Sequence, residues 1–219
     1  MTRALIALTS HSKLGETGRE TGFYVGEAAE PWEVFRAAGY DVDLVSVAGG
    51  QPPQDGREEN DKTQNDFLAT ADVANTPKAA EVDPAGYDIL VFAGGHGAMW
   101  DFPGNPDLAR IARSIYERGG VVAAVCHGPA ALVDLKLSDG ANLVAGKRVA
   151  GFTNDEEAAV GLTDQVPFLL ADKLTEAGAQ HVPAPDFTEH VVVDDRLVTG
   201  QNPQSARALA EAIVTLTNA

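Results

Sequence analysis

Short apolar runs alternate with amphipathic segments along almost the whole chain, and this alternation limits the fold more than any other feature of the sequence. Runs in which consecutive residues are apolar are typical of strands that are buried on both faces. Strands and helices in alternation predict a mostly parallel sheet with helices on both faces. We therefore expect one α/β domain over residues 1–219, with no linker inside it.

The expected elements follow from periodicity and from turn residues such as the Gly-Gly pairs. We predict strands at 3–10, 41–50, 87–95, 121–125 and 147–153, and a hairpin at 190–200 that turns at Asp194 and Asp195. We predict helices at 31–40, 106–120, 128–135, 155–162, 167–179 and 203–218, and a loop at 96–105. Residues 51–84 are polar and irregular, with a short helix within 61–76, and we interpret them as an insertion or lid.

Charge, cysteine content and hydropathy exclude several classes of protein. The net charge of −16 argues against nucleic acid and anionic membranes as partners. One cysteine cannot form an internal disulfide, so the chain does not need an oxidising compartment to fold. The apolar run near the N-terminus is too short for a signal peptide, and no stretch is long enough to span a bilayer. We expect a cytoplasmic protein.

The single cysteine lies where a strand is expected to end and a helix to begin, in the segment AVCHGPAAL. A sharp turn there would push the Cys126 side chain out over the sheet, as in a nucleophile elbow. The N-terminus of the following helix would favour the thiolate and lower the pKa of the thiol. A free cysteine is more often a small buried hydrophobe, but the strand, the glycine and the helix start favour a nucleophile.

Two further segments should meet Cys126 at the carboxyl ends of the strands, where functional groups of such sheets gather. His127 is a candidate general base and needs an orienting acceptor, which the segment TNDEE can supply. The glycines of AGGHG are either simple turn residues or donors of exposed amides to an oxyanion, and the elbow favours the second role.

Four segments resemble the ThiJ/PfpI superfamily: AVCHGPAAL, FAGGHGAMWDFP, GFTNDEE and DDRLVTGQNPQSA. More narrowly, they are similar to its heat-shock chaperone and glyoxalase III branch. The resemblance implies a class I glutamine amidotransferase-like, flavodoxin-like fold, a three-layer sandwich. It runs over nearly the whole chain. The segment GGQPPQDGREEN departs from the branch pattern and is expected to border the cleft.

The resemblance also implies roles for four catalytic residues. Cys126 corresponds to the elbow nucleophile and His127 to its adjacent histidine. Glu27 corresponds to the acidic residue that contacts the thiol, and it should be protonated, because a carboxylate would be repelled by a thiolate. Glu157 corresponds best to the carboxylate that orients the histidine, although Glu156 and Asp155 are close enough to be alternatives.

The remaining site residues come from the glycine-rich segment. Gly95 corresponds to the oxyanion-binding loop of the family, and Gly97 is a further candidate for exposing its amide there. His96 and Trp100 are expected to line the substrate pocket. No metal cluster or phosphate loop is visible in the sequence, so neither a metal nor a cofactor is expected.

The activity that the resemblance implies is a glutathione-independent glyoxalase reaction, which converts methylglyoxal or glyoxal and water to the hydroxy acid. The substrate would be a small reactive dicarbonyl, and relatives suggest a homodimer. The same residues also suit a cysteine hydrolase such as a peptidase or amidase, or a protein deglycase. Two alternatives involve no glyoxalase activity: a stress chaperone, and a redox sensor whose cysteine becomes oxidised.

Overall fold

A computed structural model describes residues 1–218, and its centre is a mostly parallel sheet. The strands lie in the order β3-β1-β5-β6-β10-β9, and the pairing between β10 and β9 is antiparallel whereas the other pairings are parallel. Their bounds are β1 Arg3–Leu8, β3 Asp41–Ser46, β5 Ile89–Phe92, β6 Val121–Val125, β9 Val191–Asp194 and β10 Leu197–Gly200. The expected α/β sandwich with a mostly parallel sheet is confirmed.

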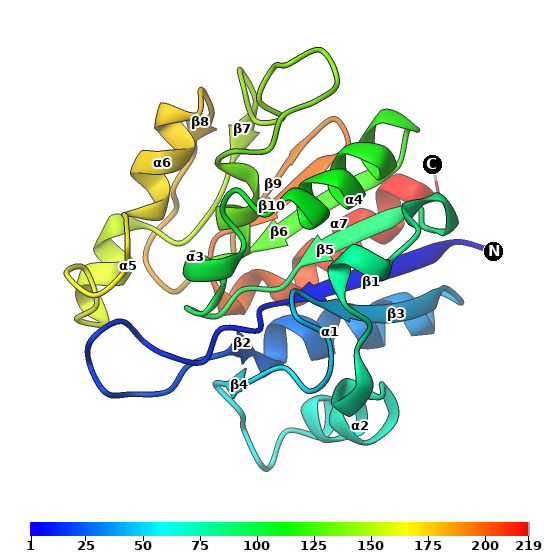
Figure 1. The fold of residues 1–219 in the computed structure, drawn as a ribbon, viewed down its shortest axis with the longest axis horizontal. Helices are drawn as coiled ribbons and strands as arrows, with labels where there is room; N and C mark the ends of the chain where they lie inside the picture. Colours follow the sequence, from blue (N-terminus) through cyan, green and yellow to red (C-terminus); the bar gives the residue numbers. More distant parts are fainter. Residues whose placement is uncertain (219) are drawn as a thin grey trace.

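Helices cover both faces of this sheet (Figure 1). α1 (Val25–Ala37) and α7 (Ala206–Thr217) pack against each other on one face, and α4 (Pro106–Glu117) covers β5 and β6 on the other. The middle strands β5 and β6 are buried at every position, as their unbroken apolar sequences predict. α5 (Asn154–Ala159) and α6 (Leu170–Glu176) lie between β6 and β9 in the chain.

Three elements differ from the expectation, each for a local reason. α1 begins at Val25 instead of Pro31, because buried side chains such as Trp32 and Phe35 hold the helix together across the internal proline. The strand expected at 147–153 is reduced to β7 (Arg148–Val149), which pairs with β8 (Gln180–His181) outside the main sheet. The loop expected at 96–105 contains the short helix α3 (Ala98–Asp101).

The turn after β6 is also tighter than expected. The α-helix expected at 128–135 is replaced by the shorter 3₁₀ helix η4 (Gly128–Leu132). The hairpin at 190–200 is confirmed, but its two-residue turn is Asp195 and Arg196, one residue later than predicted, and Asp195 has a positive φ of 54°.

The polar region at 51–84 packs on the body of the protein. The expected short helix is α2 (Lys62–Thr70), whose buried Phe67 meets Trp32 of α1 edge to face at 5.8 Å. β4 (Gln54–Asp55) pairs with β2 (Phe23–Tyr24), which leads directly into α1. Short 3₁₀ helices follow at η1 (Val73–Asn75), η2 (Ala79–Glu81) and η3 (Pro84–Gly86), and η5 (Pro203–Ser205) precedes α7. That this region acts as a lid stays a prediction.

Across residues 1–218, no helix combines the length and the apolar character needed to cross a membrane.

Candidate active site

Cys126 lies immediately after β6 in a strained backbone conformation, as the elbow interpretation predicts. Its φ is 59°, a left-handed value that is uncommon for residues other than glycine. The turn is fixed by the amide of Cys126, which donates to the carbonyl of Gly200, and by the amide of Phe152, which donates to the carbonyl of Cys126. Gly128 makes this turn possible, since a Cβ there would lie 2.2 Å from the carbonyl oxygen of Phe92.

The sulfur is buried, and this reverses one expectation. Only 3% of Cys126 is exposed. Burial raises the pKa of the Cys126 thiol well above its usual value, and the nearby Glu27 carboxyl raises it further. A hydrogen bond from the backbone of His127 opposes this shift without overcoming it. The expected lowering of the thiol pKa by a helix N-terminus is therefore wrong, because η4 is a short 3₁₀ turn and Cys126 is almost fully buried.

Glu27 approaches the thiol from the first turn of α1. Its Oε2 accepts a hydrogen bond of 2.8 Å from the amide of Gly94, and its side chain is fully buried. Its Oε1 is buried and has no hydrogen-bond partner among residues 1–218. Burial raises the pKa of Glu27 to about 8, so the carboxyl is protonated at neutral pH, as expected.

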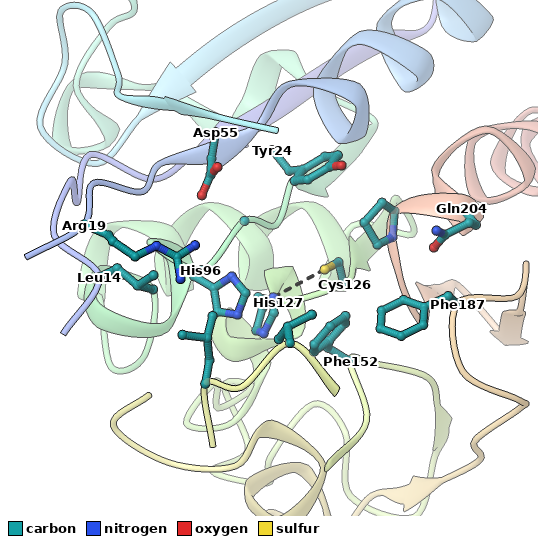
Figure 2. Close-up of a pocket in the computed structure, with 14 residues that line it drawn as sticks. Leu14, Arg19, Tyr24, Asp55, His96, Cys126, His127, Phe152, Phe187 and Gln204 are labelled. Atoms are coloured by element: carbon teal, nitrogen blue, oxygen red, sulfur yellow. Dashed lines mark hydrogen bonds between the residues drawn. The ribbon is translucent and has the colours of Figure 1, made fainter. Parts of the chain in front are cut away.

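His127 lies between the thiol, which it contacts in Figure 2, and the carboxylate of Glu157. Its Nδ1 lies 3.3 Å from Sγ of Cys126, and its Nε2 lies 2.7 Å from Oε2 of Glu157. Because the carboxylate accepts, Nε2 carries the proton and Nδ1 turns its lone pair toward the sulfur. Burial, together with the neighbouring His96, lowers the pKa of His127 to about 4, so the imidazole is neutral at neutral pH.

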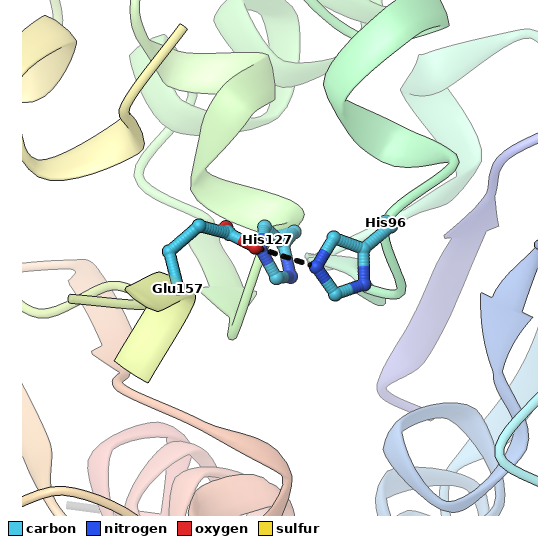
Figure 3. A group of neighbouring side chains, drawn as sticks. All are labelled: His96, His127 and Glu157. Carbon is cyan, nitrogen blue, oxygen red and sulfur yellow. Dashed lines mark hydrogen bonds and ion pairs between the residues drawn. The ribbon is translucent and has the colours of Figure 1, made fainter. Parts of the chain in front are cut away.

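Glu157 binds two histidines at once (Figure 3). It lies in the first turn of α5, and its Oε1 accepts a second hydrogen bond of 2.8 Å from Nε2 of His96. Burial would raise the pKa of Glu157, but the hydrogen bonds from His127 and His96 outweigh it and lower the pKa to about 2. The structure thus brings Glu157, and not its neighbour Glu156, to His127.

The same three side chains are the group that could ligate a metal ion. The donor atoms of His96, His127 and Glu157 lie within 4.8 Å of one another. Two histidines and a carboxylate would suit a transition metal. The Nε2 atom of each histidine, however, already donates a hydrogen bond to Glu157, and an ion bound there would have to displace both protons. That the site works without a metal or cofactor stays a prediction.

The glycine-rich segment supplies Gly95 and His96 to the cavity, but not the other two expected residues. Gly95 has a φ of 95°, and a Cβ there would lie 2.2 Å from the carbonyl oxygen of Gly22. Gly97 and Trp100 are not among the residues that line this cavity, and the role of the Gly97 amide at an oxyanion stays a prediction. Gly97 packs closely against the backbone of His11, and the Trp100 ring stacks on the His11 ring with centroids 5.0 Å apart.

The cavity above Cys126 has a volume of about 300 Å³. Loops far apart in sequence contribute most of its lining, which the motifs did not identify. These residues are Leu14, Arg19, Tyr24, Asp55, Phe152, Val160, Leu162, Phe187, Pro203 and Gln204 (Figure 2). Phe152 lies within GFTNDEE and could have been found from that motif. Asp55 lies in GGQPPQDGREEN, so the expectation that this segment borders the cleft is confirmed.

The fold and the site define a class: an α/β sandwich with a cysteine at a strained turn after a central strand, a histidine beside it and a carboxylate hydrogen-bonded to that histidine. The chain belongs to the DJ-1/PfpI family, whose sequence model matches residues 20–216.

Three similar proteins extend this finding. Glyoxalase 3 of Candida albicans is 37% identical over 98% of each chain. The glutathione-independent glyoxalase HSP31 of Saccharomyces cerevisiae is 36% identical over 95% of this chain and 94% of the yeast protein. The crystal structure of Rapid Encystment Protein 24 kDa (REP24) of Francisella tularensis superposes with a TM-score of 0.95 at 39% identity, over 99% of each chain. The resemblance to the glyoxalase III branch is confirmed.

Proposed function

We propose that this protein is a glutathione-independent glyoxalase that converts methylglyoxal or glyoxal to the hydroxy acid through Cys126. The observation that carries the proposal is the alignment of Sγ of Cys126, Nδ1 of His127 and Oε2 of Glu157 at the base of one cavity, at 3.3 and 2.7 Å. The similarity to glyoxalases over nearly the whole chain supports it. The residues that perform the chemistry are part of the proposal.

The first step joins the thiol to the aldehyde. His127 Nδ1 takes the thiol proton as Sγ attacks the aldehyde carbon, and then gives it to the alkoxide that forms, which yields a neutral hemithioacetal and restores the neutral imidazole. Glu157 stabilises the imidazolium that forms, through the proton on Nε2. The amide of Gly95, which lines the cavity, and the protonated carboxyl of Glu27 are the donors that we assign to the developing oxyanion.

The second step moves a proton between the two carbons of the substrate. His127 removes the proton from the carbon bonded to sulfur, which gives an enediol, and a proton is returned to the neighbouring carbon. The former aldehyde carbon is thereby oxidised to a thioester, and the former ketone carbon is reduced to an alcohol. Water then hydrolyses the thioester and releases the hydroxy acid and the free thiol, so that the net change is the addition of one water. This balance places the reaction with the hydro-lyases.

The deciding experiment measures lactate formed from methylglyoxal by the pure protein and by its Cys126→Ser variant, in buffers without amines, which react with the substrate. We expect lactate from the wild type and none above background from the variant. Activity that survives in Cys126→Ser would exclude the cysteine mechanism. A wild type that forms no lactate yet suppresses client aggregation would favour the chaperone alternative, and one that cleaves amides or removes glycation adducts would favour the hydrolase or deglycase.

The homodimer and the cytoplasmic location stay predictions of the sequence resemblance. Sedimentation velocity of the pure protein tests the first, and fractionation of the source cells tests the second.

A further inference from the structure

The cavity is larger than methylglyoxal requires. Methylglyoxal has five non-hydrogen atoms, whereas a cavity of about 300 Å³ is at the lower end of the range found for drug-sized ligands. Cys126 and His127 occupy its buried end, so a dicarbonyl bound at the sulfur would leave the outer part of the cavity unfilled. A longer substrate can fill that space.

The side chains around the outer part divide into a polar and an apolar wall (Figure 2). Tyr24 and Asp55 lie on one side, and Phe152 and Phe187 lie on the other. The centroids of the two phenylalanine rings are 6.3 Å apart. Val160 and Leu162 are further apolar residues that line the cavity, and we count them with this wall. This wall therefore offers an apolar surface that a two-carbon or three-carbon dicarbonyl would scarcely touch.

Two side chains of the apolar wall are exposed, whereas most large apolar side chains in the protein are buried. Within residues 1–218, the exposed large hydrophobic side chains are Met1, Val160, Phe187 and Val193. Val160 is 41% exposed and Phe187 is 40% exposed, and both border the same cavity. Exposed apolar side chains gathered at one cavity mouth mark a binding surface more often than single exposed residues do.

Phe187 is held in this exposed position by its backbone. Its φ of 53° is left-handed, which is unfavourable for a bulky residue, and its amide donates a hydrogen bond of 2.8 Å to Oε1 of Glu156. Strained residues persist where the surroundings fix them, and they cluster at ligand sites. Glu156 is the group that fixes this one.

Glu156 also ties together the other segments that border the apolar wall. Its carboxylate is fully buried and accepts from the amide of Thr153 at 3.0 Å, from Nε2 of Gln201 at 3.2 Å and from Nδ2 of Asn202 at 2.9 Å. These donors belong to the start of α5 and to the segment that leads to Pro203 and Gln204 at the cavity. One buried carboxylate thus sets the relative positions of three wall segments.

We propose that the outer cavity is a subsite for the apolar side group of a longer 2-oxoaldehyde, seated against Phe152 and Phe187, and that Glu156 is the positioning residue of this subsite. The inference rests on the proposed glyoxalase function and names the substrate class of that site. The reaction is unchanged: RCOCHO and water give RCH(OH)COOH, and only R grows from hydrogen or methyl to a group of several carbons.

A series of alkyl 2-oxoaldehydes tests the subsite. The probes are glyoxal, methylglyoxal, ethylglyoxal, propylglyoxal and butylglyoxal, with the 2-hydroxy acid product quantified by mass spectrometry. Burying one methylene contributes about 0.8 kcal/mol, a factor of about 4 in binding. For the wild type we expect kcat/KM to rise by about twofold to fourfold with each added carbon.

Three variants locate the effect. Phe187→Ala should flatten the rise of kcat/KM with chain length. Glu156→Gln should flatten it too, because an amide cannot accept all four hydrogen bonds, and the change should appear in KM for butylglyoxal more than in kcat. Val193→Ala removes an equally exposed apolar side chain on β9, away from the cavity, and should leave the rise unchanged. A thermal melt identifies any variant that does not fold, and Phe187→Ala, at a half-exposed position, carries the test if Glu156→Gln fails to fold.

The outcomes separate the two proposals. A wild type that converts methylglyoxal but shows a flat or falling series overturns the subsite and leaves the glyoxalase function standing. A wild type that converts no member of the series overturns the proposed function, and the subsite with it. An unchanged series in Phe187→Ala, or a loss of dimer in sedimentation of that variant, overturns the assignment of Phe187 to a substrate and favours contact with a second copy of the chain.

Discussion

The Nδ1 atom of His127 lies 3.3 Å from the Sγ atom of Cys126 and faces it with a lone pair, because the Nε2 proton of the same ring is bound to Glu157. Burial raises the pKa of the thiol and lowers the pKa of His127 to about 4. The resting pair at neutral pH is therefore a neutral thiol and a neutral imidazole. In the proposed mechanism, proton transfer from the thiol to His127 must therefore accompany the attack on the substrate.

The activity should have a bell-shaped pH dependence with limbs set by two buried groups. The rate falls as the pH drops through about 4, where His127 becomes protonated and can no longer accept the thiol proton. It falls again as the pH rises through about 8, where Glu27 loses the proton that it donates. We expect kcat/KM for methylglyoxal to show both limbs in amine-free buffers. An acid limb near 6.5, the value of an ordinary histidine, would contradict this environment for His127.

The thiol itself should be alkylated more slowly at neutral pH than an ordinary cysteine. We expect the midpoint of iodoacetamide alkylation to lie above the value of about 8.5 for a free thiol, since burial and the Glu27 carboxyl both raise the pKa. Glu27→Gln should lower the midpoint relative to the wild type, because the carboxylate charge is gone. Cys126 is the single cysteine, so all labelling reports on it. A higher midpoint in Glu27→Gln would show instead that Glu27 stabilises the thiolate.

Removing the base should cost more than removing its acceptor. His127→Ala should lower kcat by about 10³-fold or more, since general-base catalysis typically contributes about 10²-fold to 10⁴-fold. Glu157→Gln should lower kcat by about 10²-fold, because the amide oxygen can still accept from one of the two histidines. Steady-state turnover of methylglyoxal measures both. Equal losses in the two variants would mean that the tautomer of His127, and not only its orientation, depends on the charge of Glu157.

Gly94 is needed because the site closes around it. A Cβ at this position would lie 2.5 Å from Oε2 of Glu27 and 2.6 Å from the carbonyl oxygen of Val125. Gly94→Ala should destabilise the fold by about 1–3 kcal/mol, as overpacking does, and abolish turnover.

Gly26→Ala is the matched control for this prediction. Gly26 lies within α1, where a Cβ would meet its nearest neighbour at 3.5 Å, an ordinary contact, and alanine favours a helix. Chemical denaturation and turnover of the two variants give the comparison. A Gly94→Ala variant as stable and active as Gly26→Ala would mean that the site relaxes around an added methyl group.

Much of the fold followed from local sequence. Apolar runs identified the sheet strands, and α4 was identified by the proline in its first turn and the glycines after its end. Pro31 misled the start of α1, because packing of the buried face outweighs the one backbone hydrogen bond that a proline removes. The segment after β7 does not continue as a strand, because its amides donate elsewhere. Ala150 donates to the hydroxyl of Thr199 on β10, and Phe152 donates to the carbonyl of Cys126 at the elbow.

By itself, the sequence identified the cysteine at the elbow, the histidine beside it and the group of acidic residues that includes Glu157, because these residues share short contiguous motifs with fixed local geometry. Only the tertiary structure decided between Glu156 and Glu157, raised the pKa of the thiol, and brought Tyr24, Asp55 and Phe187 to one cavity. These properties depend on burial and on contacts between segments far apart along the chain. No local pattern of residues carries that information.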